Sequence, residues 1–574
     1  MNENNQGMRR KLTDYGDAEF SLYLRKAFIK AMGFTDDALS RPVIGIANTF
    51  SSYNACHATV PQMVEAIKRG VMLAGGLPMD FPTISLHESF SYPTSMYLRN
   101  LMSMDTEEMM RALPMDACIV IGGCDKTVPA QLMAAASADI PTIVVVTGPM
   151  LSGSHQGERV CACTDCRRFW ASYRAEQIDA REIEAVTDRL VTSAGTCGVM
   201  GTASTMACMT EAMGMMLPGG ATIPAVHADR LRHAEQAGAR AMSLAGEGLA
   251  PSRIMTEKSL ANSLRVLLAI GGSTNGLLHL AAIAGRVGIQ IDMEAFDAMG
   301  SETPVLIDLK PTGSAYMDDL HAAGGMATIM RELKPLLHLD CVTVTGRTLG
   351  EEIDALPPAF EQNVVRPLSN PIHTGGGIVF LKGNLSGDGA IIKQSACSEE
   401  LLVHKGRAVV FDSLDDLAVR IDDPDLDVAA NDVLVLRNAG PKGAPGMPEA
   451  GYIPIPKKLA KQGVKDMVRI SDCRMSGTAF GTIVLHASPE AAIGGPLALV
   501  QNGDEISLDV PARRLSLEIS EKELQHRREA WTPPDEPLVR RGYQKLFFDH
   551  VTQADEGCDF DFSVNRPYVG RTPV

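Results

Sequence analysis

The sequence predicts an α/β protein with an N-terminal α/β domain, built on a largely parallel sheet, and a C-terminal β-rich, barrel-like domain. Over the first three hundred or so residues, short β-branched runs alternate with helical patterns, as in parallel sheets. From Cys341 to Gly377 the chain becomes proline-rich and ends in three glycines, which indicates a junction. Beyond it the pattern is mostly β. We therefore expect domains at residues 1–365 and 376–574 of the 574-residue chain.

The elements follow in a regular order. The strands expected in the N-terminal sheet are Pro42–Ala47, Pro82–Leu86, Ala117–Ile121 and Ile143–Val146. Helical patterns begin near Val60, Pro129, Ile178, Met206 and Ile270. The C-terminal β runs are GIVFL, AIIK, RAVVF, DVLVLR, MVRIS, TIVLH, EISLDV and RLSLEI, which predict a barrel or sandwich of about eight strands. The charged last forty residues are expected to form a packing or subunit-contact arm.

Composition excludes several classes of protein. Hydrophobic residues make up 45% and charged residues 21%, with a mean hydropathy of +0.01, which is typical of a soluble globular chain. A net charge of −16 argues against nucleic acid or an anionic membrane as a partner. The sequence has neither an apolar run long enough for a membrane helix nor a signal core, so a cytoplasmic location is expected. Twelve cysteines are too few for a disulfide scaffold, which leaves buried, catalytic or metal-bound thiols.

Three cysteines stand alone in loops that lead into helices. Cys56, Cys124 and Cys197 each lie in a loop rich in Gly or Asn, and such loops can converge at one edge of a parallel sheet. Thiolates hold iron–sulfur clusters, and a site with three cysteines leaves one metal position open to substrate. The alternative for each thiol alone is a small buried hydrophobe.

A tighter group, Cys161, Cys163 and Cys166 in CACTDC, has metal-like spacing. A zinc site needs four ligands, and His155 could serve as the fourth. The alternative, which we favour, is a local loop with free or structural thiols.

Acidic residues on separate loops suggest a hard cation. Glu88, Asp125 and Glu449 could share a magnesium ion, which takes oxygen ligands from a few carboxylates. Each of them alone could instead be a solvated carboxylate or a helix cap. Lys126 could contact an anionic substrate or, modified by carbon dioxide, become an oxygen ligand.

The segment SDCRMSGTAFG places Ser476 and Thr478 at a turn after a strand. The sequence offers no GxSxG elbow nearby, so a hydrolase triad is weakly supported. A serine beside a cationic metal centre could lose its proton and act as a base. The alternative is a structural Ser-Gly turn.

The residues singled out above lie in long motifs that follow one another along the chain. The motifs are NACH, GGCDKT, GTCGVMGTAST, GGSTN, GNLSGDGAIIK, GPKGAPGMPE and SDCRMSG. From about residue 10 to its end, the chain resembles the dihydroxy-acid and sugar-acid dehydratase family, and within it the pentonate (L-arabinonate-type) branch.

The resemblance implies roles for residues already singled out. The implied cluster ligands are Cys56, Cys124 and Cys197, and the implied magnesium ligands are Glu88, Asp125, carbamylated Lys126 and Glu449. Ser476 would be the base, with Thr478 beside it. The branch carries a [2Fe–2S] cluster, with [4Fe–4S] as the alternative, and family members are usually homodimers or homotetramers.

The implied reaction is dehydration of a small sugar acid to a 2-keto-3-deoxy acid by a hydro-lyase. L-Arabinonate or a related pentonate or hexonate, such as D-fuconate or D-galactonate, is the expected substrate. One alternative is the dihydroxy-acid dehydratase of branched-chain amino acid biosynthesis, and another is an iron–sulfur electron carrier that uses the CACTDC cysteines. Two residues depart from the family pattern: Cys473 replaces a small residue, and Glu88 stands where branched-chain enzymes more typically have aspartate.

Overall fold

A computed structural model describes residues 6–534 and 541–565. Its N-terminal part contains a four-stranded parallel sheet in the order β2-β1-β3-β4, and this confirms the predicted α/β class. The strands are β1 (Val43–Asn48), β2 (Leu77–Pro82), β3 (Ala117–Gly122) and β4 (Thr142–Val146).

The prediction of a strand at Pro82–Leu86 is wrong. The observed strand β2 precedes it, with Leu77 paired to Val43 and Pro82 paired to Asn48, so that β2 ends where β1 ends. The sequence of β2, LPMDFP, lacks β-branched residues and carries two prolines, and therefore has no local strand signal. The chain beyond Pro82 is free to leave the sheet and form a loop.

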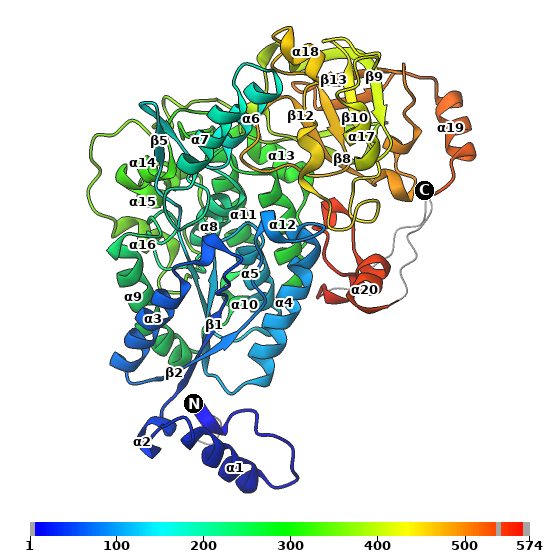
Figure 1. Ribbon diagram of the computed structural model, residues 1–574. Coiled ribbons are helices and arrows are strands. Elements are labelled where there is room, and N and C mark those ends of the chain that lie inside the picture. Colours follow the sequence, from blue (N-terminus) through cyan, green and yellow to red (C-terminus); the bar gives the residue numbers. More distant parts are fainter. Residues whose placement is uncertain (1–5, 535–540, 566–574) are drawn as a thin grey trace.

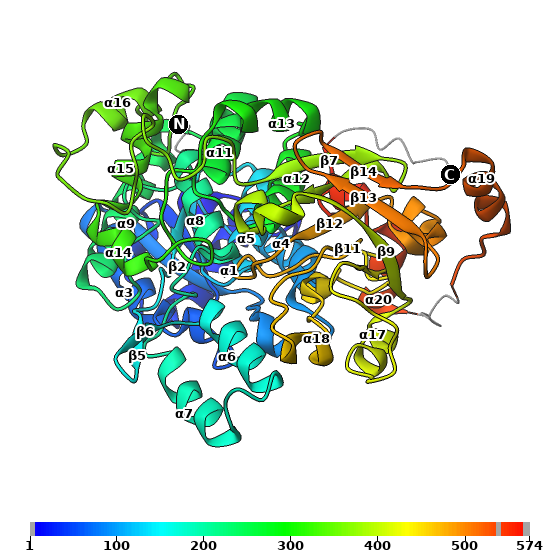
Figure 2. The ribbon, with the colours of Figure 1, turned by 90° about the horizontal axis from the view of Figure 1, so that it is seen from above.

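Helices cover both faces of this sheet (Figures 1 and 2). On one side lie α3 (Val60–Leu73) and α9 (Ala228–Glu247), and on the other α4 (Ser95–Ala112) and α5 (Thr127–Ala138). The apolar face predicted for α3 is buried against the sheet. Gly70 and Gly238 let α3 and α9 approach closely, because a Cβ at either position would collide with a backbone carbonyl of the other helix.

Other helices and a short hairpin complete the N-terminal part. The hairpin strands are β5 (Gly153–His155) and β6 (Glu158–Val160). The helices are α1 (Ala18–Lys30), α2 (Asp36–Leu39), α6 (Thr164–Arg174), α7 (Ala180–Leu190), α8 (Thr202–Ala212), α10 (Pro251–Ile254), α11 (Glu257–Ala269), α12 (Thr274–Arg286), α13 (Met293–Glu302), α14 (Met317–Ala322), α15 (Gly325–Leu333) and α16 (Leu349–Asp354).

The C-terminal part forms a closed barrel in the order β10-β11-β12-β8-β7-β14-β13-β9, as the eight β runs predicted. Its strands are β7 (Val379–Gly383), β8 (Ser386–Ile392), β9 (Val403–Phe411), β10 (Val433–Leu436), β11 (Arg469–Ser471), β12 (Ile483–Ser488), β13 (Glu505–Asp509) and β14 (Arg514–Leu517). The helices are α17 (Leu414–Arg420), α18 (Lys457–Lys461), α19 (Glu521–Ala530) and α20 (Gly542–His550). Alternate residues of the strands fill the barrel with Val, Ile and Leu.

The barrel packs against the N-terminal part through a shared core and a buried ion pair. Met475 and Ala479, in the loop between β11 and β12, belong to the same apolar cluster as the parallel sheet and its helices. Near the end of the chain, Asp559 accepts hydrogen bonds at 2.6 and 3.0 Å from Arg286 of α12. Because Met475 and Ala479 share the apolar cluster of the sheet, the loop after β11 is held against the sheet. Within the described ranges, no helix is both long and apolar enough to span a membrane.

Lys393, just after β8, supports a prediction about stability. Its side chain is 1% exposed, and its Nζ has no hydrogen-bond partner among the described residues. Burial lowers the pKa of this lysine from 10.5 to about 7. Between about pH 7 and 10.5 the unfolded chain therefore binds a proton that the folded chain does not, and this contribution to stability rises with pH.

We expect Lys393→Met to raise the melting temperature at pH 7, because it removes a buried charge that costs on the order of a few kcal/mol. The gain should shrink towards pH 10, because the free energy of releasing the lysine's proton on folding falls as the pH nears 10.5, the pKa in the unfolded chain. Thermal unfolding at the two pH values measures this, with Lys382→Met at an exposed lysine of β7 as the control. An equal gain at both pH values would contradict the prediction.

Candidate active site

The carboxyl ends of the parallel strands bring most of the predicted site residues together. Cys56 lies in the short helix after β1, and Glu88 begins the short helix that follows β2. Cys124 follows β3 directly, and Cys197 follows Thr196, which pairs with Pro149 beyond β4. Parallel strands end at a common edge, so loops that are far apart in sequence meet there.

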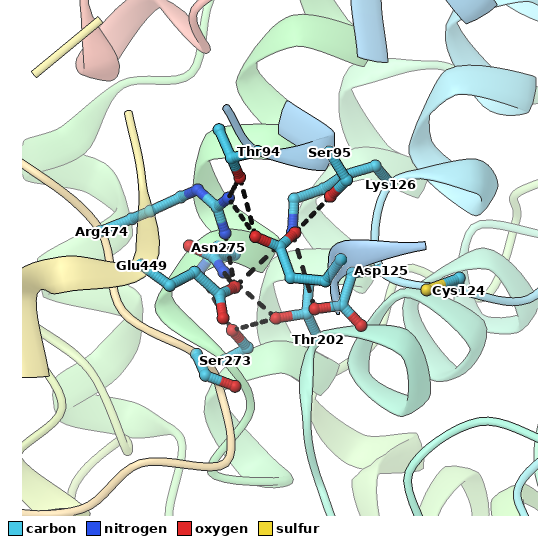
Figure 3. A network of polar contacts seen from close by, with 12 residues as sticks. Thr94, Ser95, Cys124, Asp125, Lys126, Thr202, Ser273, Asn275, Glu449 and Arg474 are labelled. Carbon is cyan, nitrogen blue, oxygen red and sulfur yellow. Dashed lines mark hydrogen bonds and ion pairs between the residues drawn. The ribbon is translucent and has the colours of Figure 1, made fainter. Parts of the chain in front are cut away.

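Three carboxylates form one half of the site (Figure 3). Oxygen atoms of Glu88, Asp125 and Glu449 all lie within 4.8 Å of one another. Glu449 comes from the barrel side, in the short helix Glu449–Tyr452 between β10 and β11. The Nζ of Lys126 lies 3.4 Å from Glu88, 3.6 Å from Asp125 and 3.7 Å from Glu449. The site is thus built from both parts of the chain.

Arg474 is a second buried cation in this group, and the sequence analysis gave it no role. It donates to Glu449 at 2.5 Å and to Glu88 at 3.1 Å, and is itself fully buried. Burial opposes the charge of Glu88, but the Arg474 and Lys126 cations outweigh it and hold the pKa of that carboxyl well below its ordinary value. Burial and the neighbouring Glu88 raise the pKa of Glu449. The group thus combines three partly buried carboxylates with two fully buried cations.

The donor set of this group fits a magnesium ion. All three carboxylates offer hard oxygen ligands from separate loops, as Mg²⁺ prefers. The Nζ of Lys126 is fully buried among them without a hydrogen bond in the described part of the chain. A buried amine in this position is available for modification to an anionic oxygen ligand, as the resemblance implies.

The three predicted cluster cysteines form the other half of the site. The Cys56 and Cys124 sulfurs lie within 4.8 Å of each other, and the Cys124 thiol and burial together raise the pKa of the Cys56 thiol. Cys163 lowers the pKa of the Cys197 thiol, but burial and the charges of Asp125, Cys56 and Cys124 outweigh it and raise that pKa. A ring nitrogen of His87 lies within 4.8 Å of the Cys56 and Cys124 sulfurs. Such thiols lose their protons when a metal binds, and soft thiolates suit iron–sulfur clusters. The residues therefore fit the predicted cofactor.

The loop with Ser476 and Thr478 lies between the two parts of the chain. The two hydroxyls are 2.8 Å apart, and Ser476 is 7% exposed. Thr164, at the start of α6, donates to the carbonyl of Thr478 at 3.0 Å. Gly477 packs so closely on Ser273 that a Cβ would collide with it. Contacts with Thr164 and with Ser273 therefore fix the position of the loop that carries Ser476.

The GGSTN segment forms part of the support for this loop. Asn275 donates to the carbonyl oxygen of Met475 at 3.1 Å and to the hydroxyl of Thr202 at 3.2 Å. Its amide nitrogen also lies 3.5 Å from Glu449. Ser273 and Thr202 are joined by a hydrogen bond of 2.9 Å between their hydroxyls. The start of α12 therefore ties the serine loop to the carboxylate group (Figure 3).

Several cysteines occupy positions that their spacing did not predict. The zinc alternative for CACTDC is not supported, because His155 pairs with Glu182 at 2.8 Å. Cys161 is buried in an apolar cluster, whereas the Cys163 sulfur lies 3.1 Å from that of Cys197. Cys473 is fully buried in an apolar cluster that is separate from the barrel interior and includes residues of α17, α18 and α20, and its sulfur accepts a hydrogen bond from Ser471. Of the CACTDC thiols, Cys163 is the one whose sulfur contacts a predicted cluster cysteine. The spacing of the motif could not predict which loop Cys163 would contact.

Comparisons with known proteins agree with this arrangement. Residues 41–352 match the dihydroxy-acid/6-phosphogluconate dehydratase N-terminal model, and residues 363–558 match the C-terminal model of the same family. The chain is 45% identical to an L-arabinonate dehydratase of Rhizobium leguminosarum bv. trifolii, over 96% of this chain and 95% of that protein.

Two further relatives have different names. A 6-deoxy-6-sulfo-D-gluconate dehydratase of Pseudomonas putida is 45% identical over 94% of this chain and 93% of its own length. A dihydroxy-acid dehydratase of Methanothrix thermoacetophila is 41% identical over 93% and 96%. Together, the two family models cover the residues of the site. The chain therefore belongs to the dihydroxy-acid/6-phosphogluconate dehydratase family, and its relatives include proteins named as sugar-acid dehydratases.

Proposed function

We propose that this chain is a sugar-acid dehydratase that converts an aldonate to the 2-keto-3-deoxy acid. L-Arabinonate is the proposed substrate, with D-fuconate, D-galactonate and other pentonates or hexonates as close relatives. The observation that carries the proposal is the meeting of an oxygen-donor group, a thiol group and the Ser476 loop at one edge of the sheet. Identity to an L-arabinonate dehydratase over nearly the whole chain supports the choice of substrate.

The carboxylates and the cluster cysteines would hold the two cofactors. Glu88, Asp125 and Glu449, with carbamylated Lys126, would bind Mg²⁺, and the three cysteines would bind a [2Fe–2S] cluster, with [4Fe–4S] as the alternative. When bound, Mg²⁺ would supply positive charge for the substrate carboxylate and C2 oxygen, and the cluster a Lewis-acidic iron for the C3 hydroxyl. The residues of both groups lie close enough to serve adjacent carbons of one small substrate.

Ser476 would take the proton from C2. The C3 hydroxyl then leaves as water, and the enol that remains becomes the 2-keto acid, so no net electron transfer occurs. The hydroxyl of Thr478 is 2.8 Å from that of Ser476 and can orient it or stabilise its deprotonated form. Arg474 forms ion pairs with Glu449 and Glu88, and these pairs would keep both carboxylates from accepting the C2 proton.

The test is a substrate panel. The chain is purified without oxygen, its iron and sulfide are quantified, and 2-keto acid formation with Mg²⁺ is measured on L-arabinonate, D-fuconate, D-galactonate, D-xylonate and dihydroxyisovalerate. We expect about two irons per chain and the highest kcat/KM on a pentonate. Preference for dihydroxyisovalerate would favour the branched-chain alternative, and iron without dehydration would favour an electron carrier.

The assembly and location complete the proposal. We propose a cytoplasmic homodimer or homotetramer whose only partner in the reaction is the small sugar acid, without nucleic acid or membrane. Light scattering on the purified chain measures the number of subunits directly. A monomer that retains full turnover would contradict this part of the proposal and leave the reaction itself intact.

A further inference from the structure

Cys163 lies in the cluster pocket although no motif of the family assigns it a role. It directly precedes α6 and is partly buried. Its sulfur is 3.1 Å from the sulfur of Cys197. Loops separated by 34 residues in sequence place these two thiols in contact.

The thiols of the pocket form two pairs. The Cys56 and Cys124 sulfurs lie within 4.8 Å of each other, and Cys163 and Cys197 are the second pair. The pairs are near enough for the charge of Cys163 to act on Cys56. A [2Fe–2S] cluster contains two irons, and each of them takes two protein ligands when all four are cysteines. The arrangement of the four sulfurs therefore matches that ligand set.

The position of Cys163 is also coupled to the serine loop. Thr164, the next residue, donates to the carbonyl of Thr478, two residues from Ser476. Cys163 is thus one residue away from a contact with the loop that carries the proposed base.

We propose that Cys163 is a fourth thiolate ligand of the cluster when no substrate is present, paired with Cys197 on one iron. This inference rests on the proposed function, because it requires that the pocket holds an iron–sulfur cluster. The substrate would then have to displace Cys163 to reach the iron, while Cys56, Cys124 and Cys197 keep the cluster in place. Cys163 would control access to the open position.

His87 is the competing ligand, since its ring lies beside Cys56 and Cys124. It accepts a hydrogen bond at 3.2 Å from the backbone of Ser89 through Nδ1. The Cys56 and Cys124 pair already provides two thiolates for one iron, whereas the thiol that contacts Cys197 within the described residues is that of Cys163. Cys163 is therefore the better candidate for the remaining position.

The experiment is Mössbauer spectroscopy on ⁵⁷Fe-enriched, anaerobically purified protein, together with iron and sulfide analysis. In the wild-type protein without substrate we expect both irons in all-sulfur sites, and thus one quadrupole doublet. Cys163→Ala should give two doublets of equal area and a changed visible circular dichroism spectrum. Cys161→Ala, in the same motif but buried in an apolar cluster, should leave the wild-type spectra unchanged.

The outcomes separate this inference from the proposed function. Two irons per chain with two doublets already in the wild-type protein, unchanged in Cys163→Ala, would overturn the role of Cys163 and leave the dehydratase proposal standing. If those two doublets change in His87→Phe instead, His87 is the ligand. A wild-type protein without iron and sulfide would overturn both. Because the wild-type spectrum alone tests the ligand set, the result does not depend on the stability of a variant.

Discussion

Ser476→Ala is expected to lower kcat on the preferred aldonate by about 10²- to 10⁴-fold, the range that general acid–base catalysis provides. The iron content should stay at the wild-type value, because Ser476 contacts Thr478 and not the thiols of the pocket. Removing one hydroxyl from a loop held on both sides leaves that loop in place. Initial-rate kinetics and iron analysis on the same preparation measure both quantities.

A serine elsewhere in the barrel serves as the control for this variant. Ser507 lies on β13, away from the loop between β11 and β12, and Ser507→Ala should keep both activity and iron. The KM of Ser476→Ala should change little, since the substrate is held mainly by the carboxylate group and its cation. Full turnover in Ser476→Ala with a normal cluster would show that another group takes the C2 proton.

Glu449→Gln is expected to raise the Mg²⁺ concentration needed for half-maximal activity by on the order of 100-fold. Loss of outer-shell partners alone weakens metal sites by about 10- to 100-fold, and Glu449 is a proposed direct ligand. The substitution removes one of the three carboxylates, while the charge of Arg474 still acts on Glu88. The negative charge that attracts the ion is thereby reduced.

Isothermal titration with Mg²⁺ and activity against Mg²⁺ concentration test this prediction. Glu400→Gln makes the same charge change at an exposed site of the barrel and should behave like the wild-type protein. The iron content of Glu449→Gln should be normal, because the cysteines are separate from the carboxylates. An unchanged Mg²⁺ requirement would place the ion elsewhere and remove the reason for grouping the three acids.

The identity of the site residues followed from the sequence to a large extent. Cys56, Cys124, Asp125 and Lys126 lie in short motifs directly after or near buried β runs, and such runs are defined by local side-chain preferences. The eight strands of the barrel were likewise predicted, because each is a β-branched run bounded by turn residues. Ser476 was predicted to be the base from the whole SDCRMSG motif, because a Ser-Gly turn in isolation is more often structural. That role stays a prediction.

The interactions between these residues required the tertiary structure. Arg474 lies two residues before Ser476 in sequence, but only packing of the barrel on the sheet places its guanidinium between Glu88 and Glu449. The contact between Cys163 and Cys197 depends on how α6 docks, and no periodicity encodes it. Strand β2 was misplaced because pairing with β1, rather than propensity, determines where it lies.

The sequence by itself determined the fold class, the order of the elements and the types of side chain available for catalysis, because these depend on local pattern and composition. The tertiary structure alone decided which of those side chains share a site. Distances between loops are set by strand register, helix packing and the docking of the barrel, and these contacts join residues hundreds of positions apart. Hydrogen bonds, ion pairs and metal ligation all depend on those distances.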